Sequence, residues 1–234
     1  MVFDSKAFFD TLFSSIFFVP ALTTLAITFL AMAMAIVLGF GGALAALSRY
    51  RALRWLAQGY LGFFRGVPVL VQIVFWYNAL PVLTNNAINL PALVAGTIAL
   101  ALNEGAYMTE IIRSGLISVD PCQREAARAL GMTKPMAMRR IVMPQALKVI
   151  IPPTGNQFIA MLKTTSLLFA IAVPEIFSTG TNIYSQNFKY FEVLFVVSIW
   201  YLVLTALLTA LQKVIERRFA VRPRRSTVLA QEHG

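Results

Sequence analysis

The feature that most constrains the fold is a long stretch without charge. Between Asp10 and Arg49 the sequence contains no charged residue and is largely apolar. A helix of about 20 apolar residues is enough to cross the hydrocarbon core of a bilayer, so this stretch is long enough for more than one element. Its phenylalanine-rich beginning, before Pro20, predicts a separate interfacial helix. A transmembrane span is expected to follow within 20–47.

Four further apolar segments predict transmembrane helices. They cover residues 67–83, 91–112, 153–173 and 193–211. Hydrophobic residues make up 58% of the chain and charged residues only 13%, against about 25% in typical soluble domains. A soluble domain this apolar could not cover its own surface. We therefore predict an all-α integral membrane protein with five transmembrane helices.

The distribution of basic residues predicts the orientation of these spans. Cytoplasmic loops of membrane proteins carry an excess of Lys and Arg. All but three of the 20 basic residues fall between spans one and two, between spans three and four, or after span five. This asymmetry predicts an N-terminus outside and a C-terminus inside. The net charge of +10 is thus interpreted as a signal of topology and of contact with anionic lipid, and not of nucleic-acid binding.

The longest predicted cytoplasmic loop, at about 118–146, contains signals for two short helices. Asp120 is a suitable N-cap with Pro121 at the first helical position, and an alanine-rich run follows. Gly131 ends this helix, and a second short helix is expected to end before Pro144. On helix propensity alone, the segment could equally be a solvated connector that carries positive charge.

A spaced motif within this loop points to a known family. Glu125-Ala126-Ala127 is followed by Gly131 and then by Ile141-Val142-Met143-Pro144. This pattern resembles the EAA loop of ABC importer permeases, from which it departs only in Met143, a volume-conserving replacement of Leu. Three other segments resemble the polar amino-acid uptake branch, which includes permeases for histidine, glutamine, glutamate and arginine. These segments are FRGVPVLVQIVFWY, NEGAYMTEIIRSGL and LKTTSL, at 64–77, 103–116 and 162–167.

The resemblance implies a type I ABC importer permease fold and a transport role rather than catalysis by this chain. The chain would form the translocation pathway by alternating access, and coupling helices in the loop would connect it to a separate ATPase. The residues to which the resemblance assigns this coupling are Glu125, Ala126, Ala127, Arg128, Gly131 and Pro144. Because the sequence has no Gly-x-x-x-x-Gly-Lys-Ser/Thr loop, ATP and Mg²⁺ would be used by the partner, and no cofactor is expected on this chain.

The resemblance also implies partners and a location. The expected partners are two ATP-binding-cassette subunits, a second permease chain in a homodimer or heterodimer, and an extracytoplasmic solute-binding protein. The protein would be a multi-pass component of the bacterial inner membrane. It would divide into an N-terminal periplasmic or interfacial segment (1–19), a permease domain (20–219) and a cytoplasmic tail (220–234). The N-terminal segment and a loop at 179–190 are the expected contacts of the binding protein.

Polar residues inside the predicted spans are candidates for the substrate pathway. Ionisable groups are costly in a bilayer and usually face a cavity or a partner. Lys163 is the candidate donor to a substrate carboxylate; alternatively, it forms an ion pair with Glu104 or Glu110 that joins spans three and four. The complete candidate set is Asn103, Glu104, Tyr107 and Glu110 in the third span, and Asn156, Gln157, Lys163, Thr164, Thr165 and Ser166 in the fourth.

Several expectations concern helix geometry. The Pro-Pro-Thr-Gly sequence at 152–155 predicts broken helical backbone at the start of span four, of a kind that can line a cavity. Glu110 and Arg113 are three residues apart and are expected to pair within one helix. Gln72 is expected to bond to a neighbouring helix. Close helix packing is expected at Gly39, Gly41 and Gly42.

Other function classes are poorly supported by the residue types present. The only histidine is His233 and the only cysteine is Cys122, so neither a metal site nor a catalytic constellation is expected. Two alternatives stay open: a permease of the same fold for another small polar solute, such as an opine or an amino-acid derivative, and a non-transporting membrane scaffold. The sequence does not decide which amino acid is carried.

Overall fold

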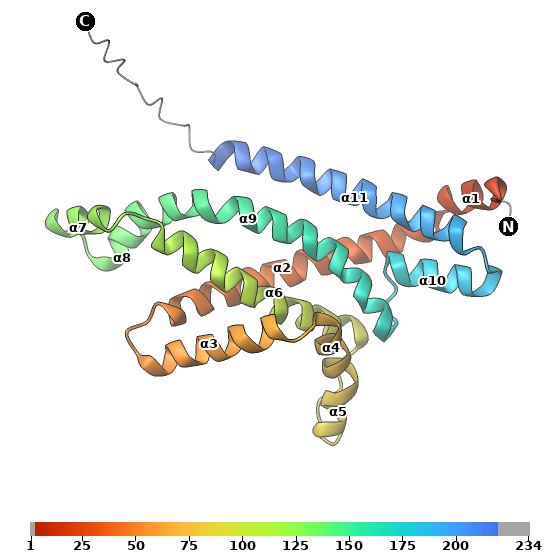
Figure 1. Ribbon diagram of the computed structural model, residues 1–234, viewed down its shortest axis with the longest axis horizontal. Coiled ribbons are helices and arrows are strands. Elements are labelled where there is room, and N and C mark those ends of the chain that lie inside the picture. Colours follow the sequence, from red (N-terminus) through yellow and green to blue (C-terminus); the bar gives the residue numbers. More distant parts are fainter. Residues whose placement is uncertain (1–2, 220–234) are drawn as a thin grey trace, which may run out of the picture.

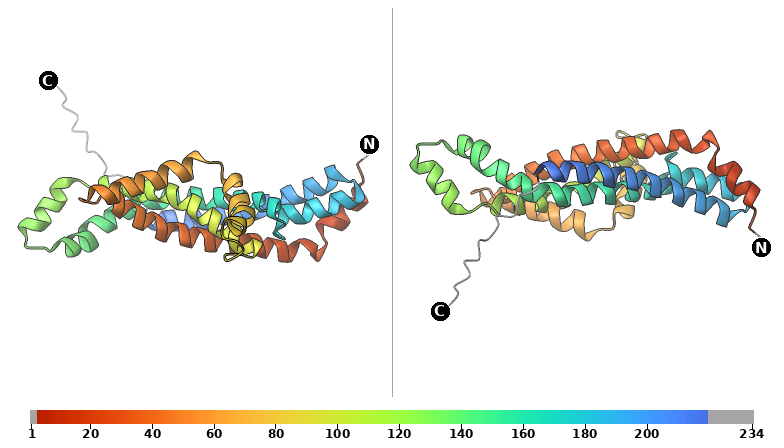
Figure 2. Two further views of the ribbon diagram at one scale, coloured as in Figure 1. Left: turned by 90° about the horizontal axis from the view of Figure 1, so that it is seen from below. Right: turned by 90° about the horizontal axis from the view of Figure 1, so that it is seen from above.

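The helices of the computed structural model run side by side along one long axis (Figure 1). The structure describes residues 3–219, and no strand is formed within that range. Helices α7 (Pro121–Ala129) and α8 (Lys134–Ala137) lie at one end, while α1 (Ser5–Leu12) and α10 (Ile176–Asn187) lie at the other. Two further views show the same arrangement (Figure 2). The predicted tail at 220–234 lies outside the described residues.

The phenylalanine-rich N-terminal segment forms a separate helix, as predicted. A short 3-10 helix, Ser15–Phe17, joins α1 to the long apolar helix α2 (Phe18–Ala46). α1 packs against the beginning of α11 (Tyr190–Phe219), where the rings of Phe8 and Phe195 lie 5.7 Å apart. The segment is therefore anchored to the last long helix and does not lie only along an interface.

Polar contacts fix the start of α1 beside the start of α11. The Asp4 carboxylate accepts a hydrogen bond of 3.0 Å from the Ala7 backbone N–H and forms an ion pair with Lys189. The Asp4 backbone N–H donates to Glu192 Oε1 at 2.9 Å. The Ala7 N–H, followed by Lys189, holds the pKa of Asp4 below its usual range, because both favour the charged carboxylate.

The most extensive helix contact joins α2 to α6 (Ala92–Ile117). Small residues allow it: a Cβ atom on Gly39 would lie 2.5 Å from Met108 Cβ and 2.8 Å from the Met108 carbonyl carbon. A Cβ atom on Gly42 would likewise lie too close to the Thr109 side chain. A Cβ atom on Gly41 would have no neighbouring atom within 4 Å. The prediction of close packing is confirmed for Gly39 and Gly42 and is wrong for Gly41.

The second predicted span departs most from expectation. Residues Arg51–Gly66, which the sequence analysis left between two spans, form the amphipathic helix α3, packed against α2 and α6. After a bend of 102° the chain continues as α4 (Val69–Val74). A wide π turn, Phe75–Ala79, then leads into α5 (Leu80–Leu83). The predicted straight helix over 67–83 is thus one arm of a bent pair.

Pro68 explains this bend. Val67 is extended, with φ −97° and ψ 132°, because a proline disfavours helical backbone at the residue before it. The interrupted helix leaves carbonyl groups without their helical donors. Gln72 Nε2 satisfies two of them, the carbonyls of Phe64 at 3.1 Å and Val67 at 2.9 Å. The expected hydrogen-bonding role of Gln72 toward a neighbouring helix is confirmed.

The fourth predicted span contains two corrections. α9 (Met143–Thr164) runs unbroken through Pro152 and Pro153, so the predicted backbone break near them is wrong. Isolated losses of N–H donors are tolerated in a packed helix, and the Thr154 hydroxyl bonds the Ile150 carbonyl at 2.8 Å. The regular helix instead changes at Thr165–Ile171 to a 3-10 helix, and a bend of 47° leads into α10. That helix also replaces most of the loop expected at 179–190.

The second loop helix does not end before Pro144, contrary to the prediction. α8 passes through a wide π turn, Met138–Val142, directly into α9. The wider turn accommodates a proline, which has no N–H to donate and clashes with the preceding helical turn. The second loop helix and the fourth long helix are therefore one continuous element.

Among the described residues, two helices are each long and apolar enough to cross a membrane, namely Ser15–Ala46 and Tyr190–Arg218. The two bent pairs, α3 with α4–α5 and α8–α9 with α10, raise this number to four if each pair is one span. α6 contains 26 residues, about 39 Å of helix, but carries Glu104, Glu110 and Arg113. It matches the third predicted span and extends it to Ile117.

Candidate functional site

A polar pocket lies where α4, α6 and α9 meet. It encloses about 360 Å³, a size within the range of pockets for small molecules. Apolar side chains from all three helices form part of its wall. Its lining residues are Val69, Leu100, Asn103, Glu104, Tyr107, Gln157, Met161 and Thr164. Five members of the predicted pathway set thus meet in one place: Asn103, Glu104, Tyr107, Gln157 and Thr164.

The α6 wall of the pocket is fixed by the end of α3. Asn103 Nδ2 donates to the Phe64 carbonyl at 2.6 Å, and Tyr60 Oη donates to the Leu102 carbonyl at 2.6 Å. Asn103 and Tyr107 are four residues apart and share a helical face. The Arg65 guanidinium lies over the Tyr107 ring, 5.5 Å from its centre. The Pro68 bend therefore supplies the groups that hold the pocket wall in place.

Glu104 is the most unusual lining residue. Its side chain is buried, with 8% of the residue exposed, and Oε1 is hidden from solvent without a hydrogen-bond partner among the described residues. The other predicted carboxylate on this helix behaves differently, because Glu110 Oε2 accepts from Arg113 at 3.1 Å outside the pocket. The expected Glu110–Arg113 pair is confirmed, and Glu104 faces the pocket without such a neighbour.

Only one face of α9 reaches the pocket. Gln157, Met161 and Thr164 follow helical spacing and point toward α6. The Thr164 hydroxyl also bonds the Ala160 carbonyl at 2.9 Å. Lys163 and Ser166 line a different, open groove beside α10 and α11, together with Tyr201. The predicted cluster on this helix is therefore divided between two sites.

The remaining predicted residues of α9 lie elsewhere. Thr165 is buried and donates to the Leu162 carbonyl at 2.7 Å. Asn156 Oδ1 accepts from Gln212 Nε2 of α11 at 3.0 Å. The alternative role of Lys163, an ion pair with Glu104 or Glu110, is not found within residues 3–219. Lys163 is exposed and faces away from the pocket.

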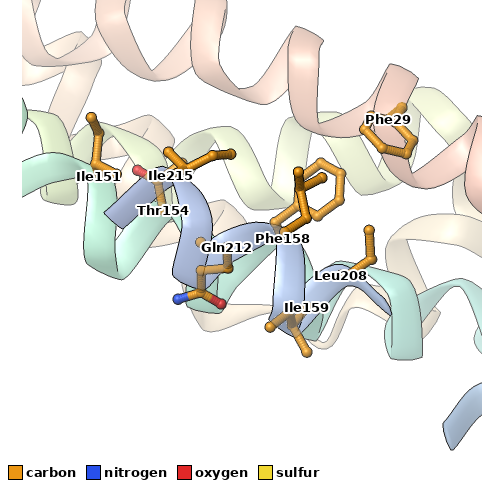
Figure 3. Close-up of a pocket in the computed structure, with 10 residues that line it drawn as sticks. Phe29, Ile151, Thr154, Phe158, Ile159, Leu208, Gln212 and Ile215 are labelled. Atoms are coloured by element: carbon orange, nitrogen blue, oxygen red, sulfur yellow. The ribbon is translucent and has the colours of Figure 1, made fainter. Parts of the chain in front are cut away.

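A second cavity, of about 230 Å³, lies between α2, α9 and α11 (Figure 3). Its walls are almost entirely apolar, and Phe29 packs edge to face against Phe158 with ring centres 4.8 Å apart. Gln212 is its main polar residue, and its amide is already bonded to Asn156 and to Glu216 Oε1, the latter at 2.7 Å. The polar residues among its described lining are Thr154 and Gln212, so this cavity suits an apolar molecule better than a polar solute.

The sequence analysis did not single out Glu175, which the structure buries completely. Its carboxylate caps α10 by accepting from the backbone N–H groups of Phe177, at 2.9 Å, and Ser178. Tyr201 Oη of α11 donates to it at 2.7 Å. Glu175 is the only acidic residue between Glu125 and Glu192, but it lies two residues beyond the predicted span 153–173, so the rule that marked Glu104 did not reach it.

The loop at the end of the molecule has the predicted two-helix geometry. Asp120 Oδ1 accepts from the Cys122 N–H at 2.9 Å and caps α7. Gly131, at φ +75°, ends α7 in a Schellman motif, in which Met132 N–H bonds the Ala127 carbonyl at 3.0 Å. Arg124 ties the start of α7 to α6 through the Leu116 carbonyl.

The exposed part of this loop coincides with the predicted coupling residues. Ala127 packs inward, with 3% exposed, whereas its neighbours face outward. The outward-facing residues of the set are Glu125, Ala126, Arg128, Gly131 and Pro144. Because α8 continues into α9, Pro144 and the polar pocket share one helical element, and α7 connects to that element through the turn at Gly131.

Comparison with known proteins gives a consistent family. Residues 38–221 match the family described as "Binding-protein-dependent transport system inner membrane component". The chain is 45% identical over 194 residues to the probable amino-acid permease protein YxeN of Bacillus subtilis, covering 83% of this chain and 87% of YxeN. It is 42% identical over 211 residues to the arginine transport system permease protein ArgU of Corynebacterium glutamicum, covering 85% of this chain and 66% of ArgU.

Solved structures share the fold. The structure of an amino acid ABC transporter with histidines contains a chain that is 38% identical, with a TM-score of 0.83 over 93% of this chain and all of that one. An inward-facing MetNI methionine ABC transporter, at 19% identity, matches with a TM-score of 0.74 over 88% of this chain and 97% of its own. The second similarity concerns the fold alone.

Proposed function

Because the chain belongs to the family of binding-protein-dependent transport system inner membrane components, we propose that it is the membrane-spanning permease subunit of an ATP-driven importer for polar amino acids. It is a transport component of the inner membrane and not an enzyme. The names of YxeN and ArgU, and of the transporter solved with histidines, support amino acids as the solute class. The observation that carries the proposal is the continuous helix from α8, which follows the exposed surface of α7 after the turn at Gly131, to the wall of the buried polar pocket on α9.

The proposed topology has five crossings, with the N-terminus outside and the C-terminus inside. The crossings are α2, the bent pair α3–α5, α6, α9 with its 3-10 continuation, and α11. Two arrangements support this topology: α7 and α8 share one end of the molecule with the end of α11, and the N-terminus lies at the opposite end. The proposed subdivision into 1–19, 20–219 and 220–234 follows from the same topology.

The proposed substrate site is the pocket between α6 and α9. Non-apolar side chains at membrane depth are tolerated where they are buried in protein or line a cavity, and this pocket gathers five of them. Asn103 and Gln157 supply amide groups from facing helices, and Tyr107 and Thr164 supply hydroxyls. Such groups suit the ammonium and carboxylate of an amino acid.

The proposed coupling surface is the exposed face of α7 around Glu125, Ala126 and Arg128. Small side chains allow a partner to approach closely, and charges at the rim favour a complementary surface. Two ATPase subunits would dock there, one on each of two permease chains, and would bind ATP and Mg²⁺ themselves. A solute-binding protein would deliver substrate at the opposite end, near α1 and α10. ATP binding and hydrolysis would then alternate the access of the pocket.

Amino-acid-stimulated ATP hydrolysis tests the proposal. The chain would be purified with its ATPase and reconstituted in vesicles with candidate binding proteins. We expect stimulation by polar amino acids and its loss in Gln157→Ala, which lies in the pocket, but not in Lys163→Ala, which lies in the other groove. Stimulation lost only in Lys163→Ala would place the site beside α11 and contradict the proposed pocket.

A second measurement tests the coupling surface. Glu125→Lys should insert normally and copurify less ATPase, because it reverses a charge on the exposed face of α7. Normal copurification and uptake by this variant would overturn the coupling role. Absence of any copurifying ATPase from the unmodified chain would overturn the transport proposal itself.

A further inference from the structure

The polar pocket contains one buried carboxyl oxygen without a hydrogen-bond partner among residues 3–219. Among the described residues that line it, Glu104 alone carries an ionisable carboxylate, and no lysine or arginine is in the lining. Glu104 Oε1 is buried and has no hydrogen-bond partner in the described part of the chain. Buried polar groups are normally bonded, and a buried charge is normally paired, so a carboxylate in this state is matched to a group that the chain itself does not supply.

Charged groups on the surrounding helices do not fill this role. From α3, the Arg65 guanidinium lies over the Tyr107 ring, and Arg65 is not among the lining residues. On α6, Arg113 is paired with Glu110. On α9, Lys163 faces the other groove. α4 contributes only Val69 to the lining. The described lining therefore offers a solute no cationic side chain, and Glu104 is its one acidic group.

Net charge decides which amino acids such a pocket favours. The charges of the ammonium and carboxylate groups of an amino acid cancel each other, so its net charge is set by its side chain. A cationic side chain neutralises Glu104, a neutral one leaves the pocket and its solute with a net negative charge, and an acidic one adds a like charge. In a site of low dielectric constant these differences are much larger than in water.

We propose that Glu104 makes this pocket selective for amino acids with a cationic side chain, such as a guanidinium or an ammonium group. The inference rests on the proposed function and concerns the specificity of the same site. In this arrangement the side-chain cation lies against the Glu104 carboxylate. The Gln157 amide and the Thr164 hydroxyl on the α9 wall, with the Tyr107 hydroxyl of α6, receive the zwitterionic group. Glu104 is thus a specificity-determining residue.

Direct binding separates this inference from the selectivity of any binding protein. The permease–ATPase complex, in lipid nanodiscs and without a binding protein, is equilibrated with radiolabelled L-arginine, L-glutamine or L-glutamate. We expect arginine to bind at least tenfold more tightly than glutamine, and glutamate most weakly. Glu104→Gln should bring the affinities for arginine and glutamine to within about twofold of each other. Glu104→Asp should retain the order, because it keeps the charge.

Glu216→Gln is the matched control, because it removes a carboxylate that bonds Gln212 outside the pocket. It should leave the order of the three amino acids unchanged. Equal or weaker binding of arginine relative to glutamine in the unmodified complex would overturn the inference without any variant, while the transport proposal would stand. An arginine preference that survives in Glu104→Gln would also overturn it. Failure of the complex to retain an ATPase would instead refute the proposed function.

Discussion

Replacing Gly39 with alanine tests whether close approach between α2 and α6 holds the structure together. The added Cβ would lie 2.5 Å from Met108 Cβ and 2.8 Å from the Met108 carbonyl carbon. Carbon atoms in contact prefer about 3.5–4.0 Å, so the helices must separate by about 1 Å. Rotation of a side chain cannot relieve this contact, because one atom is backbone and the other is the first carbon of the side chain.

The expected cost follows from two terms. Overpacking a well-packed core costs about 1–3 kcal/mol, and alanine in place of glycine within a helix gains about 1 kcal/mol. Gly41→Ala carries the same gain without the clash, because nothing lies within 4 Å of its added Cβ. The two variants should therefore differ in stability by about 1–3 kcal/mol, with Gly41→Ala the more stable.

Thermal unfolding of the purified permease–ATPase complex measures this difference. Each kcal/mol shifts Tm by about 2–4 °C for chains of this size. The two variants should be heated at one scan rate in the same lipid nanodiscs, because membrane proteins often unfold irreversibly. A Gly39→Ala complex that melts at or above the temperature of Gly41→Ala would refute the close-contact argument.

Three further outcomes are expected. Gln72→Ala should lower the free energy of unfolding by about 1–3 kcal/mol, because the Val67 carbonyl at the Pro68 bend loses its donor and the Phe64 carbonyl keeps only Asn103; an unchanged Tm would contradict this. Gly131→Ala should cost about 1–2 kcal/mol through its left-handed backbone alone and should weaken copurification of the ATPase, whereas Gly131→Asn should cost less; equal effects of the two would contradict it. The folded state lowers the pKa of Asp4, so the stability that Asp4 contributes is present above its unfolded pKa and is lost as pH falls through its folded pKa. Asp4→Asn should therefore show a smaller drop in Tm on acidification than the unmodified chain. A drop of the same size in both proteins would contradict this expectation.

Local signals were enough to predict much of the fold. Long apolar segments gave the central parts of α2, α6 and α11, because the bilayer imposes a length and a hydropathy that are visible along the chain. The cap at Asp120 and the stop at Gly131 were predicted for the same reason, since helix caps depend on neighbouring residues. α3 was missed because an amphipathic helix with arginines at both ends resembles a basic loop.

The candidate site was predicted only in part. Residues 156–166 are adjacent along the chain, but successive residues of a helix point in directions about 100° apart. Which of these directions meets α6 depends on tertiary packing, and the structure places Gln157 and Thr164 there while Lys163 lies on another face. The unpaired state of Glu104 likewise depends on neighbours from other helices, which no local pattern specifies.

The unbroken course of α8 into α9 has a mechanical consequence. Ile150 packs tightly against Gly115 of α6 and can serve as a fulcrum. At about 1.5 Å per residue, α8 near Pro135 lies about 22 Å to one side of it, and Gln157 lies about 10 Å to the other. A push on the longer arm of this lever, which carries α8, would swing Gln157 in the opposite direction through roughly half the distance. A displacement of a few ångströms at the ATPase would thus reach the pocket as about one to two ångströms.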